Sequence, residues 1–197
     1  MYKDITGILL SGGKSTRMGT NKSFLKFNGK YIIEHVHEKL KLLFKKVIII
    51  TNTPEDYYFL GSEIYKDIYK DKGPLGGIHS GLVHSTTEKN FIISCDMPLV
   101  STELMKFIID KSGESQITAV TADGYVQQLC GLYKKSCIKT AGDILNEPDN
   151  SVCKVSKLRG KTKTKIIEEN EIPFSIAGQC LNINKSGDYE KLKEMAV

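Results

Sequence analysis

Continuous apolar runs alternate along the chain with segments in which apolar residues recur at the spacing of a helix. Runs of apolar and β-branched residues without polar alternation are typical of strands buried on both faces, as in parallel sheets. Such runs occupy residues 5–10, 47–51, 91–94 and 117–121. Helical spacing connects the apolar positions between them: Ile33, Val36, Leu40 and Leu43; Ile78 and Leu82; Leu104, Phe107 and Ile108. The pattern predicts buried strands separated by helices that cover the sheet.

Weaker signals continue the alternation toward the end of the chain. Residues 129–133 and 179–183 are further strand candidates, and residues 189–195 have the pattern of a closing helix. This alternation predicts an α/β protein, folded as a three-layer α/β/α sandwich around a mostly parallel, Rossmann-like sheet. For 197 residues, one domain is the default expectation. Ligands of such sheets bind beyond the carboxyl ends of the strands, so we expect functional residues directly after them.

Composition narrows the class of protein. With 40% hydrophobic and 26% charged residues, the chain is typical of a globular protein. No apolar run approaches the roughly 20 residues that span a bilayer, and the N-terminus lacks the apolar core of a signal peptide. We therefore expect a cytoplasmic protein with no membrane partner.

Cysteines and charges add little specific chemistry. The five cysteines are widely spaced, with no Cys-x-x-Cys pair, which favours reduced, mostly buried thiols over disulfides or a metal site. A net charge of +5 favours anionic small molecules only weakly. Lysines concentrate in residues 154–165, expected as a basic loop or strand edge. Aromatic interleaving and known reading motifs are absent there, so no nucleic-acid partner is predicted.

The first strand continues into a glycine-rich, cationic loop over residues 9–22, Leu-Leu-Ser-Gly-Gly-Lys-Ser-Thr-Arg-Met-Gly-Thr-Asn-Lys. Its glycines let the backbone approach a ligand closely, and Lys14, Arg17 and Lys22 supply positive charge. The loop predicts a phosphate cradle for a nucleoside triphosphate, against the alternative of a flexible strand-to-helix turn. A P-loop is excluded because Ile8 stands where its first glycine is required, and no Gly-x-Gly-x-x-Gly supports a dinucleotide site.

A carboxylate follows the third predicted strand. Asp96 stands in Cys-Asp-Met-Pro, where Pro98 ends the strand because it has no N–H to donate. A carboxylate there can bind Mg²⁺, which takes one or two protein oxygens and completes its octahedron with water and substrate phosphates. A turn-forming Asp is the alternative, but the neighbouring phosphate loop favours the metal.

A second glycine-rich segment covers residues 69–78 and is expected as a turn leading into a helix near Ile78. Its glycines leave room for a flat base or a ribose. Asp67 and Asp71 compete as the acceptor for base or ribose donors. A purely structural turn is the alternative.

Two amides stand near the C-terminus, in Leu-Asn-Ile-Asn. Asn182 and Asn184 are separated by one residue, so an extended segment presents both on the same face. Such a face suits a polar substrate, although asparagine is also common in turns. Gln127 and Gln128 are weaker candidates to line the same opening.

Together, Leu-Ser-Gly-Gly-Lys-Ser-Thr-Arg-Met-Gly-Thr-Asn-Lys, Gly-Pro-Leu-Gly-Gly-Ile, Cys-Asp-Met-Pro-Leu and Leu-Asn-Ile-Asn resemble the molybdenum cofactor guanylyltransferases. Their order and spacing are similar along almost the whole chain. Single motifs are shared with cytidylyltransferases and sugar-phosphate nucleotidyltransferases, but Cys-Asp-Met-Pro combined with Asn-Ile-Asn is more specific.

The resemblance implies that the phosphate of molybdopterin attacks the α-phosphate of GTP, forming the guanine dinucleotide cofactor and pyrophosphate. It implies that Asp96 binds Mg²⁺ and that Arg17 and Lys22 neutralise the phosphates, so these three are the expected catalytic residues. It favours Asp67 over Asp71 and implies these GTP-binding residues: Leu10, Ser11, Gly12, Gly13, Lys22, Asp67, Gly76, Gly77 and Asp96. Asn182 and Asn184 match the positions implied for molybdopterin contact.

The resemblance also implies a division of labour within the single domain. Residues from about 1 to 100 would bind the nucleotide, and residues from about 101 to 197 would bind molybdopterin. Other molybdenum-cofactor biosynthesis proteins and acceptor molybdoenzymes are the partner proteins it implies.

Two departures from the family pattern bear on these expectations. Ser11 adds a hydroxyl where the family usually has alanine, and the sequence alone allows this hydroxyl to face solvent. Lys185-Ser186 replaces a frequent Thr-Pro. Gly12 favours guanine, since relatives that use CTP commonly have alanine there. The alternatives are a cytidylyltransferase on the same pterin, a sugar-phosphate nucleotidyltransferase, or a nucleotide-binding module without catalysis.

Overall fold

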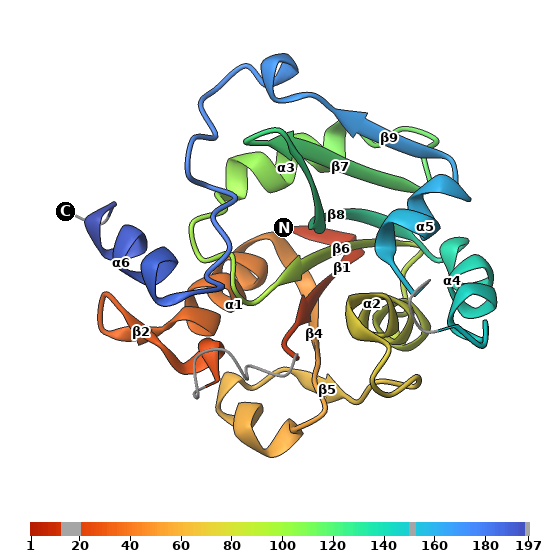
Figure 1. The fold of residues 1–197 in the computed structure, drawn as a ribbon, viewed down its shortest axis with the longest axis horizontal. Helices are drawn as coiled ribbons and strands as arrows, with labels where there is room; N and C mark the ends of the chain where they lie inside the picture. The colour runs from red at the N-terminus through yellow and green to blue at the C-terminus, as the bar shows by residue number, and fades with distance from the viewer. Residues whose placement is uncertain (13–20, 150–152, 196–197) are drawn as a thin grey trace.

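The computed structural model describes residues 1–12, 21–149 and 153–195. Within these ranges, a seven-stranded sheet has the order β5-β4-β1-β6-β8-β7-β9 (Figure 1). Its strands are β1 (Tyr2–Leu10), β4 (Phe44–Ile50), β5 (Glu63–Tyr65), β6 (Lys89–Ser94), β7 (Ile117–Ala122), β8 (Tyr125–Lys134) and β9 (Thr164–Ile167). A separate hairpin pairs β2 (Lys26–Phe27) with β3 (Lys30–Tyr31).

Neighbouring strands of the central sheet are parallel except in the two pairs that include β8. A tight turn joins β7 to β8, and its residues Asp123 and Gly124 have left-handed φ values of 51° and 77°. Such a turn matches the twist of an antiparallel hairpin. The mostly parallel sheet is therefore confirmed, while the strand predicted at residues 117–121 is antiparallel to one of its two neighbours.

Helices cover both faces of the sheet (Figure 1). They are α1 (Ile32–Leu43), α2 (Gly73–His84), α3 (Thr102–Asp110), α4 (Cys137–Leu145), α5 (Val155–Gly160) and α6 (Ser186–Glu194). Residues of α1 and α3 form one hydrophobic cluster with Ile49, whereas α2, α4 and α5 form another with Ile48 and Ile50. Successive side chains of β4 thus enter opposite cores, which explains the continuous apolar runs and confirms the three-layer sandwich.

Most predicted elements are confirmed with shifted ends. The four apolar runs are strands, residues 129–133 lie in β8, and the closing helix begins at Ser186. The strand predicted at residues 179–183 is wrong. This segment follows a turn in which Gln179 N donates to Ile176 O at 2.9 Å, and Gly178 has a left-handed φ of 71° that no strand accommodates.

Helix α2 also differs from its prediction, because it begins at Gly73 rather than near Ile78. Pro74 fits the first helical turn, where its missing N–H is not needed, and the buried Leu75 anchors that turn to the core. Residues 154–165, expected as a basic loop or strand edge, contain α5 and the start of β9.

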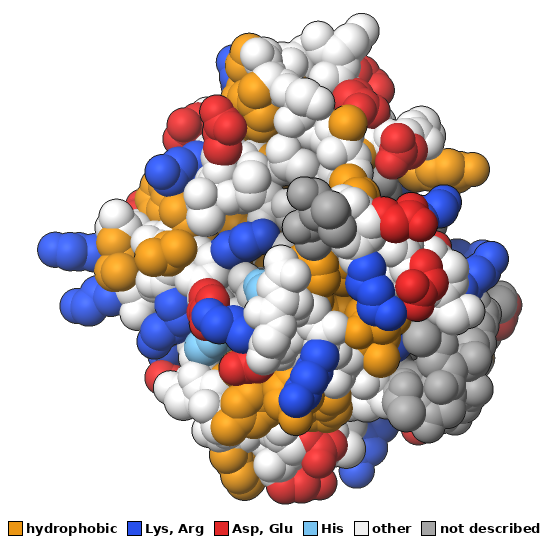
Figure 2. Space-filling view, turned by 90° about the vertical axis from the view of Figure 1, so that its left-hand side faces the viewer, with side chains coloured by type: hydrophobic (Ala, Val, Ile, Leu, Met, Phe, Trp, Pro, Cys, Tyr) orange, Lys and Arg blue, Asp and Glu red, His pale blue; other side chains and the backbone are white. Residues whose placement is uncertain are grey.

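The C-terminal segment packs beside the small hairpin. Phe27, Ile32, Ile183 and Leu192 share a hydrophobic cluster that joins α6 to β2 and the start of α1. The face that carries α6 and β2 has basic and acidic side chains intermixed (Figure 2). In the described part of the chain, no helix combines the length and apolar character needed to cross a membrane. All five cysteines are free thiols, as predicted.

Candidate active site

A cavity of about 750 Å³ opens at the carboxyl ends of β1, β4 and β6. The residues directly after each strand line it: Ser11 and Gly12, Thr51 and Asn52, and Cys95 and Asp96. Backbone hydrogen bonds extend the sheet past the strands, from Ser11 N to Ile50 O at 2.9 Å and from Cys95 N to Leu10 O at 3.0 Å. The cavity lies where parallel sheets bind ligands and has the size of a small-molecule site.

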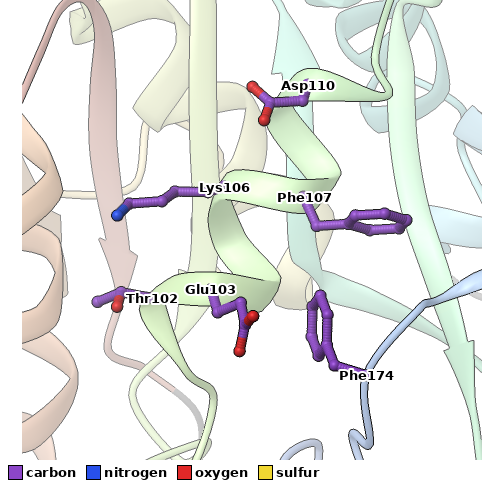
Figure 3. Close-up of a pocket in the computed structure, with 6 residues that line it drawn as sticks. All are labelled: Thr102, Glu103, Lys106, Phe107, Asp110 and Phe174. Atoms are coloured by element: carbon purple, nitrogen blue, oxygen red, sulfur yellow. The ribbon is translucent and has the colours of Figure 1, made fainter.

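A second pocket, of about 440 Å³, lies along α3. Figure 3 shows its lining, which is Thr102, Glu103, Lys106, Phe107 and Asp110 of α3 together with Phe174. Phe107 and Phe174 meet edge to face, with ring centroids 5.7 Å apart. Among the described residues, none in this lining has a buried polar side-chain atom without a partner. The cavity at the strand ends is therefore the candidate site.

Asp96 presents a carboxylate to this cavity from the end of β6. Its Oδ1 is buried and has no hydrogen-bond partner among the described residues. Burial raises the pKa of Asp96, while a hydrogen bond from Ser94 and the charge of Lys22 lower it. The described residues hold no group of three or more His, Cys, Asp or Glu side chains that could bind a metal. A cation at Asp96 would therefore need ligand or water oxygens to complete its coordination.

Lys22 reaches the same region from η1 (Lys22–Phe24), a single 3₁₀ turn. Asn21 caps this turn, because Ser23 N donates to Asn21 Oδ1 at 3.1 Å. The Lys22 ammonium donates to Asn184 Oδ1 at 2.8 Å. The structure thus joins a cation of the predicted phosphate loop to one of the two predicted pterin-binding amides.

The segment that carries both amides lies against the end of β6. Ile183 is fully buried between them, and its N–H donates to Asp96 O at 3.0 Å. Asn182 is half-buried, and its Nδ2 donates to Cys180 O at 3.3 Å, while Asn184 is exposed. The backbone of this segment forms no strand, and neither asparagine lines the cavity.

Asp67 presents a second carboxylate to the cavity, beyond the end of β5. Asn52 Nδ2 donates to its Oδ2 at 2.9 Å, and Asp67 N donates back to Asn52 Oδ1 at 3.2 Å. The other oxygen, Oδ1, is buried without a partner among the described residues. Burial raises the pKa of Asp67, the Asn52 hydrogen bond lowers it, and the charge of Asp71 raises it further. One acceptor therefore remains available to a ligand.

The two glycines of the α2 motif have different surroundings. Gly77 lines the cavity, and a methyl group there would lie 3.4 Å from Leu10 Cδ2 and 3.7 Å from Asp67 Oδ1. Gly76 does not line the cavity, and a methyl group there would lie only 2.9 Å from the carbonyl oxygen of Tyr69. Close backbone packing therefore accounts for Gly76. Asp71 also lines the cavity.

Other sequence-based candidates differ in what the structure says of them. Gly13 and Arg17 lie outside the described residues. Gln127 and Gln128 do not line the cavity, and Gln127 Nε2 instead donates to Ala122 O at 3.2 Å within the β7–β8 hairpin. The Ser11 hydroxyl does not face solvent, because Ser11 is fully buried and bonds Ser23 Oγ at 3.0 Å.

Several lining residues were absent from the sequence-based set, among them Asn52 and Tyr57. Asn52 follows β4 directly, so the rule that singled out Asp96 after β6 could have found it. Tyr57 lies in the 3₁₀ segment η2 (Pro54–Leu60), and it lines the cavity although its neighbours give no sequence signal.

Comparison with known proteins agrees with this geometry. Residues 7–159 match the family model of the MobA-like NTP transferase domain. The chain belongs to this family. It is therefore a member of a nucleotidyltransferase enzyme family.

A curated relative from Carboxydothermus hydrogenoformans, named probable molybdenum cofactor guanylyltransferase, is 33% identical over 192 residues, which cover 96% of this chain and 95% of the relative. A solved structure of molybdopterin-guanine dinucleotide biosynthesis protein A from Archaeoglobus fulgidus superposes with a TM-score of 0.82 at 21% identity, over 97% of this chain and 98% of that one. A manganese complex of Rv0371c from Mycobacterium tuberculosis gives a TM-score of 0.71 at 16% identity, over 98% and 99% of the two chains. These structures share the fold.

Proposed function

We propose that this chain is a molybdenum cofactor guanylyltransferase, which transfers GMP from GTP to the phosphate of molybdenum-molybdopterin and releases pyrophosphate. The observation that carries the proposal is the cavity at the strand ends. There, Asp96 and Lys22 lie beside the asparagine segment, and Asp67 keeps one acceptor available. A nucleotide and its acceptor each find suitable chemistry in that arrangement.

The guanine and ribose occupy the side of the cavity formed by Leu10, Gly12, Asp67 and Gly77. The buried Oδ1 of Asp67, unpaired among the described residues, accepts a hydrogen bond from a base or ribose donor, which removes the penalty of an unsatisfied acceptor. A methyl group at Gly12 would meet no described atom within 4 Å, so packing within the described protein does not require glycine. Space reserved for a purine accounts for this glycine.

The triphosphate extends toward Lys22. Arg17, which lies outside the described residues, is proposed as a second cation. Phosphoryl-type transfer leaves little covalent chemistry for the protein, so positioning and neutralisation of the developing charge supply most of the rate. Lys22 neutralises charge on the triphosphate and the departing pyrophosphate. Gly12 offers its backbone groups to the nucleotide, and Ser11 offers its carbonyl oxygen, since Ser11 N already donates to Ile50 O.

Asp96 fits a divalent cation, and we propose Mg²⁺. Its buried Oδ1, which has no partner in the described part of the chain, is a hard ligand at the cavity wall, and nucleotide phosphates and water would complete the coordination shell. When bound, the cation would supply charge neutralisation at the reacting phosphates. Burial raises the pKa of Asp96, whereas the nearby charge of Lys22 lowers it, so Lys22 favours the charged form that a cation needs.

The acceptor side is assigned to Asn182 and Asn184. Ile183 holds this segment against Asp96, so a phosphate near Asn184 would also lie near Lys22. We also propose a nucleotide-binding part of about residues 1–100 and a pterin-binding part beyond it. The first assignment is supported by the cavity lining, to which Leu129 alone contributes from the second part. A cytoplasmic location agrees with the free thiols, and cofactor-pathway proteins or acceptor enzymes are proposed partners.

Turnover with molybdopterin tests this proposal. Purified protein is incubated with Mg²⁺, molybdenum-molybdopterin and either GTP or CTP, and pyrophosphate and the dinucleotide product are quantified. GTP should yield the guanine dinucleotide and equimolar pyrophosphate. Equal or faster reaction with CTP would move the assignment to a cytidylyltransferase, and nucleotide binding without pyrophosphate release would indicate a module without catalysis.

A further inference from the structure

Three segments of the candidate site meet at one buried hydroxyl. Ser23 is 3% exposed and follows Lys22 in η1. Its Oγ lies 3.0 Å from Ser11 Oγ, 3.2 Å from Cys95 Sγ and 3.4 Å from the Tyr57 hydroxyl. Ser11 precedes Gly12 and Cys95 precedes Asp96, so the partners of Ser23 adjoin the nucleotide loop and the proposed cation ligand.

The directions of these hydrogen bonds follow from Asn21, whose amide Nδ2 can only donate. Asn21 Nδ2 donates to the Tyr57 hydroxyl at 2.9 Å, and the Tyr57 proton is then donated to Ser23. A serine hydroxyl has one proton and two lone pairs, so Ser23 has one donor and one acceptor left for Ser11 and Cys95. The Cys95 thiol can donate to Ser23 Oγ or accept from it across 3.2 Å. The hydrogen-bonding capacity of Ser23 is fully used.

We propose that Ser23 is a positioning residue for nucleotidyl transfer, which holds Lys22 and Asp96 in fixed register beneath the triphosphate. This inference rests on the proposed function and deepens it. A hydroxyl bonded to three separate segments fixes the orientation of η1, from which the Lys22 side chain extends. Through Cys95, the same hydroxyl fixes the residue before Asp96.

The position of the network distinguishes this role from ordinary core packing. Ser11, Ser23, Tyr57 and Cys95 all line the cavity, so their hydrogen bonds form its floor. Small displacements of a charge-neutralising group lower turnover strongly, since a shift of about 1 Å can reduce a rate about 100-fold. A hydroxyl that prevents such displacement affects catalysis without touching the reacting atoms.

Ser23→Ala removes the hydroxyl and leaves Tyr57, Ser11 and Cys95 each without one partner. We expect kcat/KM for GTP to fall roughly 10-fold as Lys22 loses its fixed position. Ser23→Cys keeps a small donor and acceptor and should restore most of the activity. Ser112→Ala is the matched control, because Ser112 is also 3% exposed and its Oγ bonds Ile109 O at 2.6 Å, at the end of α3. It should lower thermal stability by a similar amount while leaving kcat/KM unchanged.

A double-mutant cycle with Lys22→Met tests whether Ser23 acts through Lys22. Lys22→Met keeps the length of the side chain but removes the charge. In that background, Ser23→Ala should cause a clearly smaller further loss of kcat/KM than in the wild type, and the remaining loss should come through Asp96. Tyr57→Phe removes one donor to Ser23 and offers a milder second variant, which should show the same dependence on Lys22. Independent, multiplicative losses would overturn the positioning role.

Calorimetric titration of Mg²⁺ and GTP into the same four proteins of the cycle separates this inference from the proposed function. This measurement needs no turnover. Coupled losses of affinity support Ser23 as a positioning residue, whether or not the guanine dinucleotide forms. Failure to form the dinucleotide would contradict only the proposed reaction. Normal turnover and normal GTP affinity in Ser23→Ala would overturn the inference while leaving the guanylyltransferase assignment intact.

Discussion

Asp96 and Asp67 face one cavity from two strand ends that β1 and β4 separate, and their surroundings differ. Each has a buried Oδ1 without a described partner, and burial raises the pKa of each. Lys22 lies near Asp96 and lowers its pKa, whereas Asp71 raises the pKa of Asp67. Asn52 also holds Asp67 through two hydrogen bonds.

This contrast suits the two aspartates to different ligands, Asp96 to a metal ion with phosphates and Asp67 to the donors of a base or ribose. Lys22 lies beside Asp96, so this end of the cavity presents a positive and a negative side chain together. Such a pair suits phosphates with a bound metal ion. Asp67 has a second carboxylate nearby, which repels phosphates but strengthens acceptance from neutral N–H or O–H donors. We therefore propose that base recognition and charge neutralisation take place on different sides of the cavity.

The largest expected effect comes from Asp96→Asn, which removes the charge and keeps the shape. Turnover with GTP should fall roughly 100- to 1,000-fold, because the proposed cation loses its protein ligand. The thermal midpoint should not fall, since the variant keeps the shape of a buried side chain whose Oδ1 has no partner among the described residues. Steady-state turnover and a melting curve measure both quantities. A variant with wild-type turnover would remove Asp96 from the cation site.

Lys22→Met sharpens the same side of the comparison. GTP affinity should fall roughly 10- to 100-fold, in line with about 1.5–3 kcal/mol for a hydrogen bond to a charged group. Lys30→Met is the control, because Lys30 bonds Glu38 at 2.6 Å and does not line the cavity. Equal losses in both variants, measured by calorimetry, would indicate a general effect of net charge instead of a specific phosphate contact.

On the proposed base side, Asp67→Asn replaces one acceptor oxygen of the carboxylate with an NH₂ donor. The preference for GTP over CTP should narrow roughly 10-fold, and Asp71→Asn should change it less than twofold. Competition binding with the two nucleotides measures the ratio. If Asp71→Asn narrows the preference and Asp67→Asn does not, then the two carboxylates must exchange roles.

The smallest effect is expected for Asn52→Ala, which removes the support of Asp67 but leaves its carboxylate in place. Loss of these hydrogen bonds should weaken GTP binding about 5-fold, corresponding to about 1 kcal/mol. Calorimetry with and without Mg²⁺ should give the same ratio, since Asn52 lies on the base side. A loss that appears only with Mg²⁺ would place Asn52 at the phosphates.

The sequence predicted the strand-end side of this site well. Asp96 directly follows an apolar run, so a periodicity rule and a chemical rule identify it together. Glycine spacing and charge also singled out Lys22, which lines the cavity, whereas Lys14 and Arg17 lie outside the described residues. The sheet was predictable for the same reason, because strands buried on both faces leave continuous apolar runs.

Tertiary contacts decided what the sequence could not show. The bond between Lys22 and Asn184 joins residues far apart in the chain, and only packing of the C-terminal segment on β6 brings them together. Segment 179–183 has strand-like residues, but the left-handed Gly178 and the turn around it prevent a strand. Gly76 matched a ligand motif, although packing against Tyr69 explains it.

The assignment of the two carboxylates is tested most directly by titrating GTP into wild-type protein, Asp96→Asn and Asp67→Asn, each with and without Mg²⁺. Asp96→Asn should lose the part of the affinity that depends on Mg²⁺ and keep the rest. Asp67→Asn should bind GTP more weakly by the same factor in both conditions. The opposite pattern, or an equal Mg²⁺-dependent loss in both variants, would contradict the division between a phosphate side and a base side.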